Sequence, residues 1–138
     1  MRPVNRGVAP RTYARYGEAI GDLEDRLGIY CSYCERWIPV GLAVEHKAPK
    51  SRHPSRELEW DNFLLGCTNC NSVKGDTDVA DDEILWPDRD NLMLALEYSK
   101  GGFVGLAGSL DPSIKPRARK LIKAATKTGT NICMQAIF

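Results

Sequence analysis

Four of the five cysteines have the spacing of metal ligands. They form two C-x-x-C pairs separated by 32 residues, Cys31 with Cys34 and Cys67 with Cys70. A C-x-x-C pair brings two thiolates to one side of a tight turn, and two such turns can complete a tetrahedral Zn²⁺ site with four sulfur ligands. A redox motif of the thioredoxin type would need a strand-to-helix turn in a βαβ pattern, which the chain lacks. The spacing therefore predicts a structural zinc site, and we assign no role to the fifth cysteine, Cys133.

A second set of polar residues could support hydrolysis of a phosphodiester. Glu45 directly precedes His46, and Asn71 directly follows the last cysteine of the two pairs. Glu45 offers a carboxylate and Asn71 an amide oxygen, and a hard divalent cation such as Mg²⁺ prefers oxygen ligands of this kind. His46 has an ordinary pKa suited to taking a proton from water near neutral pH. Together they predict metal-assisted attack of water, in which the metal stabilises charge on the leaving oxygen.

The segment from 30 to 76 must contain the elements that position these groups. Residues 36–38 and 42–44 are short β-prone runs, and Pro39-Val40-Gly41 is a turn sequence between them. We therefore predict that the two runs pair as a hairpin. Glu45 and His46 would then lie at the end of its second strand.

The rest of this segment is predicted to be a loop followed by a helix. Residues 47–60 are polar and contain two prolines, which is typical of an irregular loop. Thr68 is a candidate N-cap for a short helix that ends near Gly75. Zinc would then tie the base of the hairpin to the start of the helix.

This ordered set of motifs resembles the HNH, or ββα-metal, endonucleases, in the subgroup with two zinc knuckles. The matching elements are Cys31-x-x-Cys34, Glu45-His46, Trp60-Asp61-Asn62, Cys67-x-x-Cys70-Asn71 and Lys74-Gly75-Asp76. The resemblance implies an α+β fold in which a ββα-metal core of hairpin, loop and helix is stapled by the four-cysteine zinc site and flanked by further helices. It also implies hydrolysis of DNA that leaves 5′-phosphate and 3′-hydroxyl ends.

The resemblance assigns roles to individual residues. His46 falls on the general base, and Asn62 on the central asparagine that orients the loop around the base. Asn71 and Glu45 fall on the ligands of the catalytic metal, Mg²⁺ or Mn²⁺. The Glu45 position is often Asp in the family, so this chain departs from the pattern by one methylene.

Basic residues near this core are candidates for binding the DNA backbone. Lys50, Arg52 and Lys74 are the three that we predict to contact phosphates. Solvated loop charge is the alternative for the first two, and a solvated helix end for Lys74. His53 lies in the same polar loop, and we expect no catalytic role for it. Residues 76–90 carry seven acidic residues and one arginine, so we expect this run to point away from DNA or to shield part of the site.

The flanks resemble HNH proteins of bacterial anti-phage systems, the Septu type among them. The similarity lies in the opening MRPVNRG and in the segment from Trp86 to Ser99. It implies a role in antiviral defence beside a partner ATPase. Members with this pattern usually run longer at the C-terminus, which implies a shortened member or a truncated product.

Length, composition and charge indicate the general class of protein. The 138 residues, 43% hydrophobic and 27% charged, predict one globular domain over 1–138, with a core at 30–76 and an extension at 77–138. The net charge of +1 neither favours nor excludes nucleic acid as a partner. The longest apolar stretches are far shorter than the roughly 20 residues of a membrane helix, so we expect no membrane span. The opening residues lack an apolar core of a secretory signal, so we expect a cytoplasmic protein.

Three elements are predicted outside the core. A helix should end at Gly28, and it begins either at Asp22 or earlier, since the apolar spacing extends back to Tyr13. The resemblance favours a strand at 95–98 followed by a turn at 101–102. A helix capped by Asp111 or Ser113 should run to Lys127, and its six basic residues form either a phosphate-binding face or an ordinary solvated face.

Two other functions use the same residues differently. A non-catalytic zinc module for nucleic acid or protein would need the four cysteines but not Glu45, His46 or Asn71. A toxin-like effector would have the same nuclease chemistry but would be inactive until a partner binds it. The presence of all three polar residues at the spacing of a site favours the nuclease.

Overall fold

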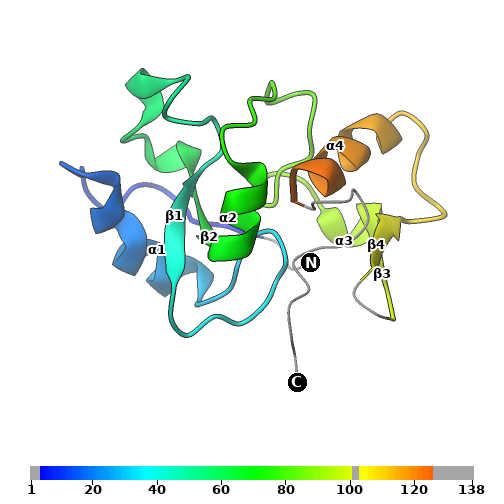
Figure 1. Cartoon of the computed structure of the whole chain (residues 1–138), viewed down its shortest axis with the longest axis horizontal. Helices are drawn as coiled ribbons and strands as arrows, with labels where there is room; N and C mark the ends of the chain where they lie inside the picture. The colour runs from blue at the N-terminus through cyan, green and yellow to red at the C-terminus, as the bar shows by residue number, and fades with distance from the viewer. Residues whose placement is uncertain (1–3, 101–102, 126–138) are drawn as a thin grey trace.

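The computed structural model describes residues 4–100 and 103–125 and has the predicted α+β class (Figure 1). Helices surround two small antiparallel sheets, β1–β2 and β3–β4. The elements in chain order are η1 (Tyr16–Ala19), α1 (Ile20–Leu27), β1 (Leu42–His46), η2 (Pro54–Arg56), η3 (Trp60–Asn62), β2 (Phe63–Cys67), α2 (Thr68–Lys74), α3 (Leu92–Ala95), β3 (Leu96–Ser99), β4 (Phe103–Leu106) and α4 (Lys115–Ala125). None of the helices among these residues has the length and apolar character needed to cross a bilayer.

The strand pairing of the core differs from the predicted hairpin. β1 pairs with β2, in a register that places Leu42 opposite Cys67 and His46 opposite Phe63. Residues 36–38 instead fold back on 29–31 around the first cysteine pair, where the N–H of Ile38 donates to the Ile29 carbonyl at 2.8 Å. The predicted hairpin of 36–38 with 42–44 was therefore wrong. The physical reason is burial, since every residue of the apolar strand β2 is buried and its backbone groups need a partner.

The apolar core surrounds the β1–β2 pair. α1 contributes the buried Leu23 and Leu27, and β2 contributes Phe63. The helical turn before α1 begins at Tyr16, so the earlier of the two predicted starts is correct. The helix ends at Gly28, whose φ of 74° is a conformation that favours glycine.

The extension forms a second group of elements beside the core. β3 and β4 pair as an antiparallel hairpin close to the predicted strand at 95–98. The predicted turn at 101–102 and the predicted helix end at Lys127 lie outside the described residues. Before α4, the N–H and Oγ of Ser113 donate to Asp111 Oδ1 at 2.8 and 2.7 Å, which stabilises the turn that leads into the helix.

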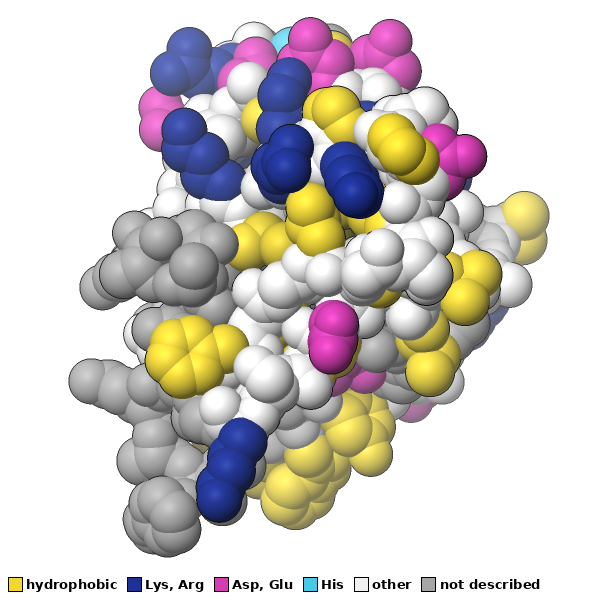
Figure 2. All heavy atoms as spheres, turned by 90° about the vertical axis from the view of Figure 1, so that its right-hand side faces the viewer, with side chains coloured by type: hydrophobic (Ala, Val, Ile, Leu, Met, Phe, Trp, Pro, Cys, Tyr) yellow, Lys and Arg dark blue, Asp and Glu magenta, His cyan; other side chains and the backbone are white. Residues whose placement is uncertain are grey.

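The basic helix α4 contacts the acidic run. Arg117 lies 3.3 Å from Asp90, and Lys120 lies 2.6 Å from Glu83. Figure 2 shows the side of the molecule that lies at the right in Figure 1. Lys and Arg side chains gather on the upper part of this side, with Asp and Glu side chains along its upper edge. The acidic run therefore supplies partners for two of the basic side chains of α4.

The two flanking motifs meet in a buried ion network. The N–H of Val4 donates to the Pro87 carbonyl at 3.1 Å. Asp88 accepts from Arg6 at 2.7 Å and from Lys47 at 2.8 Å, and all three side chains are buried. Burial alone would raise the pKa of Asp88, but the hydrogen bond from Lys47 and the two positive charges outweigh it and lower that pKa. The network joins both flanks to the residue that follows His46.

Replacing Asp88 by alanine is expected to lower the free energy of unfolding by about 3–5 kcal/mol, because two buried cations lose their shared counter-ion. Denaturant unfolding measures the change. Asp61→Ala is the matched control, because the Asp61 side chain is 86% exposed and lies 3.8 Å from Arg6. Its expected cost is below about 1 kcal/mol. Equal costs for the two variants would contradict the role given to the buried network.

Candidate active site and metal centre

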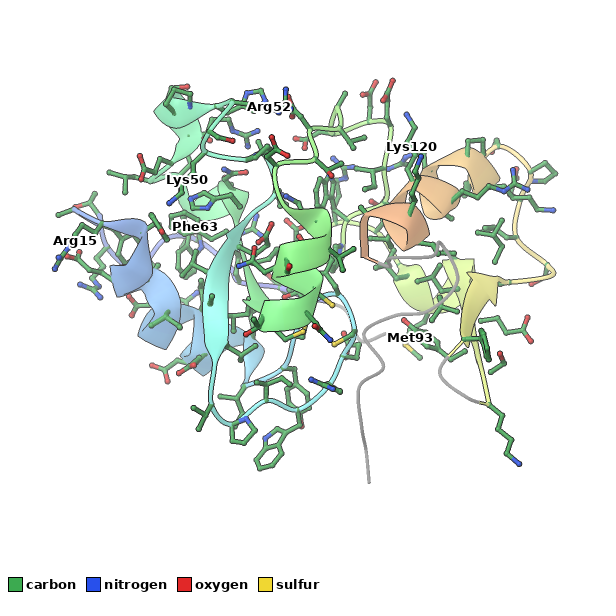
Figure 3. All side chains as sticks on the ribbon, in the orientation of Figure 1. Arg15, Lys50, Arg52, Phe63, Met93 and Lys120 are labelled. Atoms are coloured by element: carbon green, nitrogen blue, oxygen red, sulfur yellow. The ribbon has the colours of Figure 1, made fainter. Side chains whose placement is uncertain are left out.

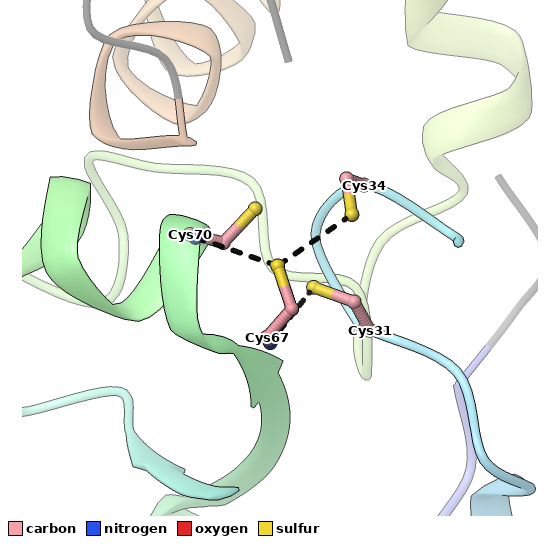
Figure 4. Close-up of side chains that lie close together, drawn as sticks. All are labelled: Cys31, Cys34, Cys67 and Cys70. Carbon is pink, nitrogen blue, oxygen red and sulfur yellow. Dashed lines mark hydrogen bonds between the residues drawn. The ribbon is translucent and has the colours of Figure 1, made fainter. Parts of the chain in front are cut away.

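The four paired cysteines converge at the start of α2. Their sulfur atoms all lie within 4.8 Å of one another (Figure 4). Tetrahedral coordination with Zn–S bonds of about 2.3 Å places sulfurs about 3.8 Å apart, and the Cys34 and Cys67 sulfurs are 3.9 Å apart. The cluster therefore has the ligand types and spacing of a structural zinc site.

Local backbone geometry brings these cysteines together. Cys67 ends β2 and is the N-cap of α2, so its Sγ accepts from the N–H of Cys70 at 3.5 Å. The predicted cap, Thr68, is instead the first residue of the helix. The N–H of Cys67 donates to Cys31 Sγ at 3.4 Å. Without a bound cation, hydrogen bonds among the four sulfurs lower the pKa of Cys31 and raise the pKa of Cys34 and Cys70, because neighbouring thiols share protons.

His46 ends β1 with its ring held on three sides. The ring packs edge-on against Tyr16 and Phe63, with centroids 4.9 and 5.4 Å away. Its Nε2 lies 3.0 Å from the Glu57 carbonyl oxygen. Because a carbonyl can only accept, Nε2 carries the proton and Nδ1 of the neutral ring is an acceptor. Burial lowers the pKa of His46, so the neutral form predominates at pH 7.

Asn62 is fully buried and holds the loop that passes over His46. Its Oδ1 accepts from the N–H of Ala48 at 2.7 Å. Its Nδ2 donates to the carbonyls of Ala48 and Arg56, at 3.0 and 3.1 Å. Arg56 directly precedes Glu57, whose carbonyl contacts His46. One amide thus fixes both ends of the loop and, through it, the orientation of the imidazole.

Glu45 and Asn71 approach each other across Gly66. A Cβ at Gly66 would lie 3.3 Å from the Glu45 Cβ and 3.8 Å from the Asn71 Cβ. Glu45 is 3% exposed, and its Oε1 lies 2.9 Å from Lys74 Nζ. Burial raises the pKa of Glu45, and the charge of Lys74 opposes this shift. β1 therefore contributes Glu45 to this cluster, β2 contributes Gly66, and α2 contributes Asn71 and Lys74.

Four of the predicted site residues, Glu45, His46, Lys50 and Asn71, border one pocket of about 390 Å³, whereas Arg52, Asn62 and Lys74 are not among its lining residues. It is lined by Tyr16, Val44, Glu45, His46, Pro49, Lys50, Ser51, Asn71, Gly75 and Asp76. A carboxylate and an amide oxygen beside open space suit a divalent cation that keeps water and phosphate ligands. The residues present therefore fit the catalytic metal that the sequence predicts.

The predicted phosphate-binding residues lie in different environments. Lys50 is exposed at the pocket, and its Nζ lies 2.7 Å from the Tyr16 hydroxyl. Arg52 is exposed and paired with Asp76 at 3.2 Å (Figure 3). Lys74 is buried to 3% exposure beneath the pocket and does not line it. A contact between Lys74 and phosphate would require its ion pair with Glu45 to open.

The acidic run begins at the edge of the site. Besides the pair between Asp76 and Arg52, Asp78 accepts from His53 Nε2 at 2.9 Å. His53 thus has a surface partner, and neither residue is among those that line the pocket. Asp76 itself lines the pocket, so the start of the run lies beside the site.

Sequence reasoning missed Tyr16 and Gly66. In the sequence Tyr16 contributes only to the apolar spacing of a helix, and its contact with His46 arises from packing between segments 30 residues apart. Gly66 carries a weak signal, since an isolated glycine in a strand often marks a close approach of another group.

Replacing Gly66 by alanine is expected to displace Glu45 by a few tenths of an ångström and to slow the DNA cleavage that the sequence predicts by about tenfold. Gly105→Ala in β4 is the matched control, because a Cβ there meets nothing within 4 Å. Cleavage rates of the two variants, compared at equal zinc content, test this. A Gly66→Ala variant as fast as the control would show that the close approach is unimportant.

The comparison with protein families agrees with this geometry. Residues 31–77 match the HNH endonuclease family. This HNH segment holds the four cysteines, Glu45, His46, Asn62 and Asn71, and it comprises about a third of the chain.

A curated relative extends the similarity to defence proteins. The chain is 35% identical over 63 residues to the Septu protein PtuB of Bacillus thuringiensis. The match covers 44% of this chain and 24% of the relative, so the chain spans about a quarter of that protein's length. No solved structure matches the chain significantly. The comparisons support a nuclease or defence role for the HNH segment.

Proposed function

We propose that this chain is an HNH endonuclease that hydrolyses DNA phosphodiester bonds with one divalent metal. The observation that carries the proposal is the pocket in which His46 lies beside Glu45 and Asn71. The hydrogen bond to Glu57 leaves His46 Nδ1 as the proton acceptor. A non-catalytic zinc module would have no need for this arrangement.

In the proposed mechanism, His46 removes a proton from the attacking water through Nδ1. The Glu57 carbonyl then stabilises the imidazolium that forms, because it already accepts from Nε2. Asn62 maintains this geometry by holding the loop. Glu45 and Asn71 would hold Mg²⁺ or Mn²⁺, which when bound supplies stabilisation of negative charge on the leaving oxygen.

The proposed DNA contacts lie at the mouth of the pocket. Lys50 is exposed there, so it can attract a phosphate without losing a buried partner. Arg52 is also exposed and can exchange its contact with Asp76 for one with phosphate, since a surface ion pair is worth little. The predicted contact from Lys74 would come at the cost of a buried pair.

We further propose that the chain acts in cytoplasmic anti-phage defence beside a partner ATPase. The similarity to the Septu protein PtuB supports this. Such an effector would have weak activity alone and higher activity with its partner.

The proposed chemistry predicts a particular product. Supercoiled plasmid incubated with the zinc-loaded protein and Mg²⁺ or Mn²⁺ should acquire nicks that DNA ligase reseals, because ligase requires the predicted 5′-phosphate and 3′-hydroxyl ends. Nicks that ligase cannot seal would contradict the hydrolysis mechanism. Binding without cleavage, under conditions that include the partner, would favour the zinc module.

A further inference from the structure

Lys74 is the most buried cation near the pocket. Lysine is rarely buried unless it is paired. The Lys74 ammonium has two acceptors, Glu45 Oε1 at 2.9 Å and the backbone carbonyl of His46 at 2.8 Å. Both acceptors belong to the end of β1, whereas Lys74 ends α2. The ammonium is therefore held at a fixed place between the two elements.

This placement puts a positive charge beside a proposed metal ligand. A divalent cation bound to the Glu45 carboxylate would lie within a few ångströms of the ammonium, because Glu45 Oε1 is itself 2.9 Å from Lys74 Nζ. Repulsion at this range is weakly screened, since both side chains are buried and salt acts mainly on exposed charges. Lys74 can withdraw only by leaving the His46 carbonyl as well.

We propose that Lys74 competes with the catalytic metal for the Glu45 carboxylate. This competition lowers the affinity of the Glu45–Asn71 site for divalent cations. The inference rests on the proposed function, because it takes Glu45 as a metal ligand. It assigns Lys74 an internal role rather than the contact with phosphate that the sequence predicts.

The competition couples metal binding to DNA binding. A phosphate at the pocket adds negative charge beside the site and offsets the repulsion by Lys74. DNA therefore raises the affinity for the cation, and the cation raises the affinity for DNA by the same factor. The site binds metal well only when substrate is present.

Mn²⁺ binding to the zinc-loaded full chain tests the inference without relying on activity. Free Mn²⁺ is measured by electron paramagnetic resonance for the wild type and for Lys74→Gln and Lys74→Met. We expect both variants to bind Mn²⁺ at least tenfold more tightly than the wild type. Lys123→Gln is the matched control, because it removes an exposed charge from α4, and its affinity should equal that of the wild type.

The Glu45→Gln variant distinguishes failure of the competitor role of Lys74 from failure of the proposed metal site. If wild-type binding depends on Glu45 but the Lys74 variants bind equally or more weakly, the competitor role is overturned and the proposed function stands. If no variant shows Mn²⁺ binding that depends on Glu45, the proposed metal site is itself overturned.

A measurement on unaltered Lys74 covers the case in which its variants fail to fold. His46→Ala should bind Mn²⁺ at least tenfold more tightly in the presence of a saturating DNA duplex. An affinity that DNA leaves unchanged would overturn the proposed coupling.

Discussion

Replacing Cys67 by serine is expected to release zinc and to abolish the cooperative unfolding of the domain. Cys67 ends β2, caps α2 and contacts the sulfurs of Cys31 and Cys34. Structural zinc contributes roughly 10–16 kcal/mol of binding free energy in small zinc-finger units, which exceeds or matches the roughly 5–15 kcal/mol stability of a typical domain. Zinc content by mass spectrometry and thermal unfolding by circular dichroism measure the effect.

Cys133→Ser is the matched control for this experiment. Cys133 belongs to neither C-x-x-C pair, so its replacement should leave zinc content and melting temperature unchanged. Near-normal zinc content and melting in the Cys67→Ser variant would refute the structural zinc site.

Replacing His46 by alanine is expected to slow DNA cleavage by about 10²- to 10⁴-fold, the usual contribution of a general base. Zinc content should be unchanged, because His46 is not among the clustered sulfur ligands. DNA binding should persist, because the exposed Lys50 and Arg52 remain. Single-turnover cleavage and fluorescence anisotropy with labelled DNA separate the two effects.

His53→Ala provides the comparison for His46. His53 pairs with Asp78 at the surface, so its loss should change the cleavage rate little. A His46→Ala variant that cleaves as fast as His53→Ala would remove His46 from the mechanism.

The clustering of the four cysteines could be predicted from sequence because each C-x-x-C pair is held together locally. Two C-x-x-C pairs leave few arrangements that satisfy four thiols, and Cys67 and Cys70 lie on one helical turn. The strand pairing could not be predicted in the same way. Residues 36–38 and 42–44 look like a hairpin from their spacing, but the pairing of β1 with β2 depends on burying a distant apolar strand, 63–67.

The candidate site also combines features that follow from local sequence with features that depend on contacts between distant residues. Glu45 and His46 are adjacent in sequence, and Asn71, in the helix α2 that follows β2, lines the same pocket. The partner of Lys74 could not be foreseen, because a lysine at a helix end is normally solvated. Its ion pair with Glu45 requires α2 to pack against β1, and that packing comes from contacts between distant residues.

The most direct test of the account is plasmid cleavage by the zinc-loaded wild type with Mg²⁺ or Mn²⁺, beside an EDTA control and His46→Ala. We expect nicking or linearisation that requires the divalent metal and disappears in His46→Ala. Absence of cleavage by folded, zinc-loaded protein, both alone and with the proposed partner ATPase, would contradict the proposed nuclease function.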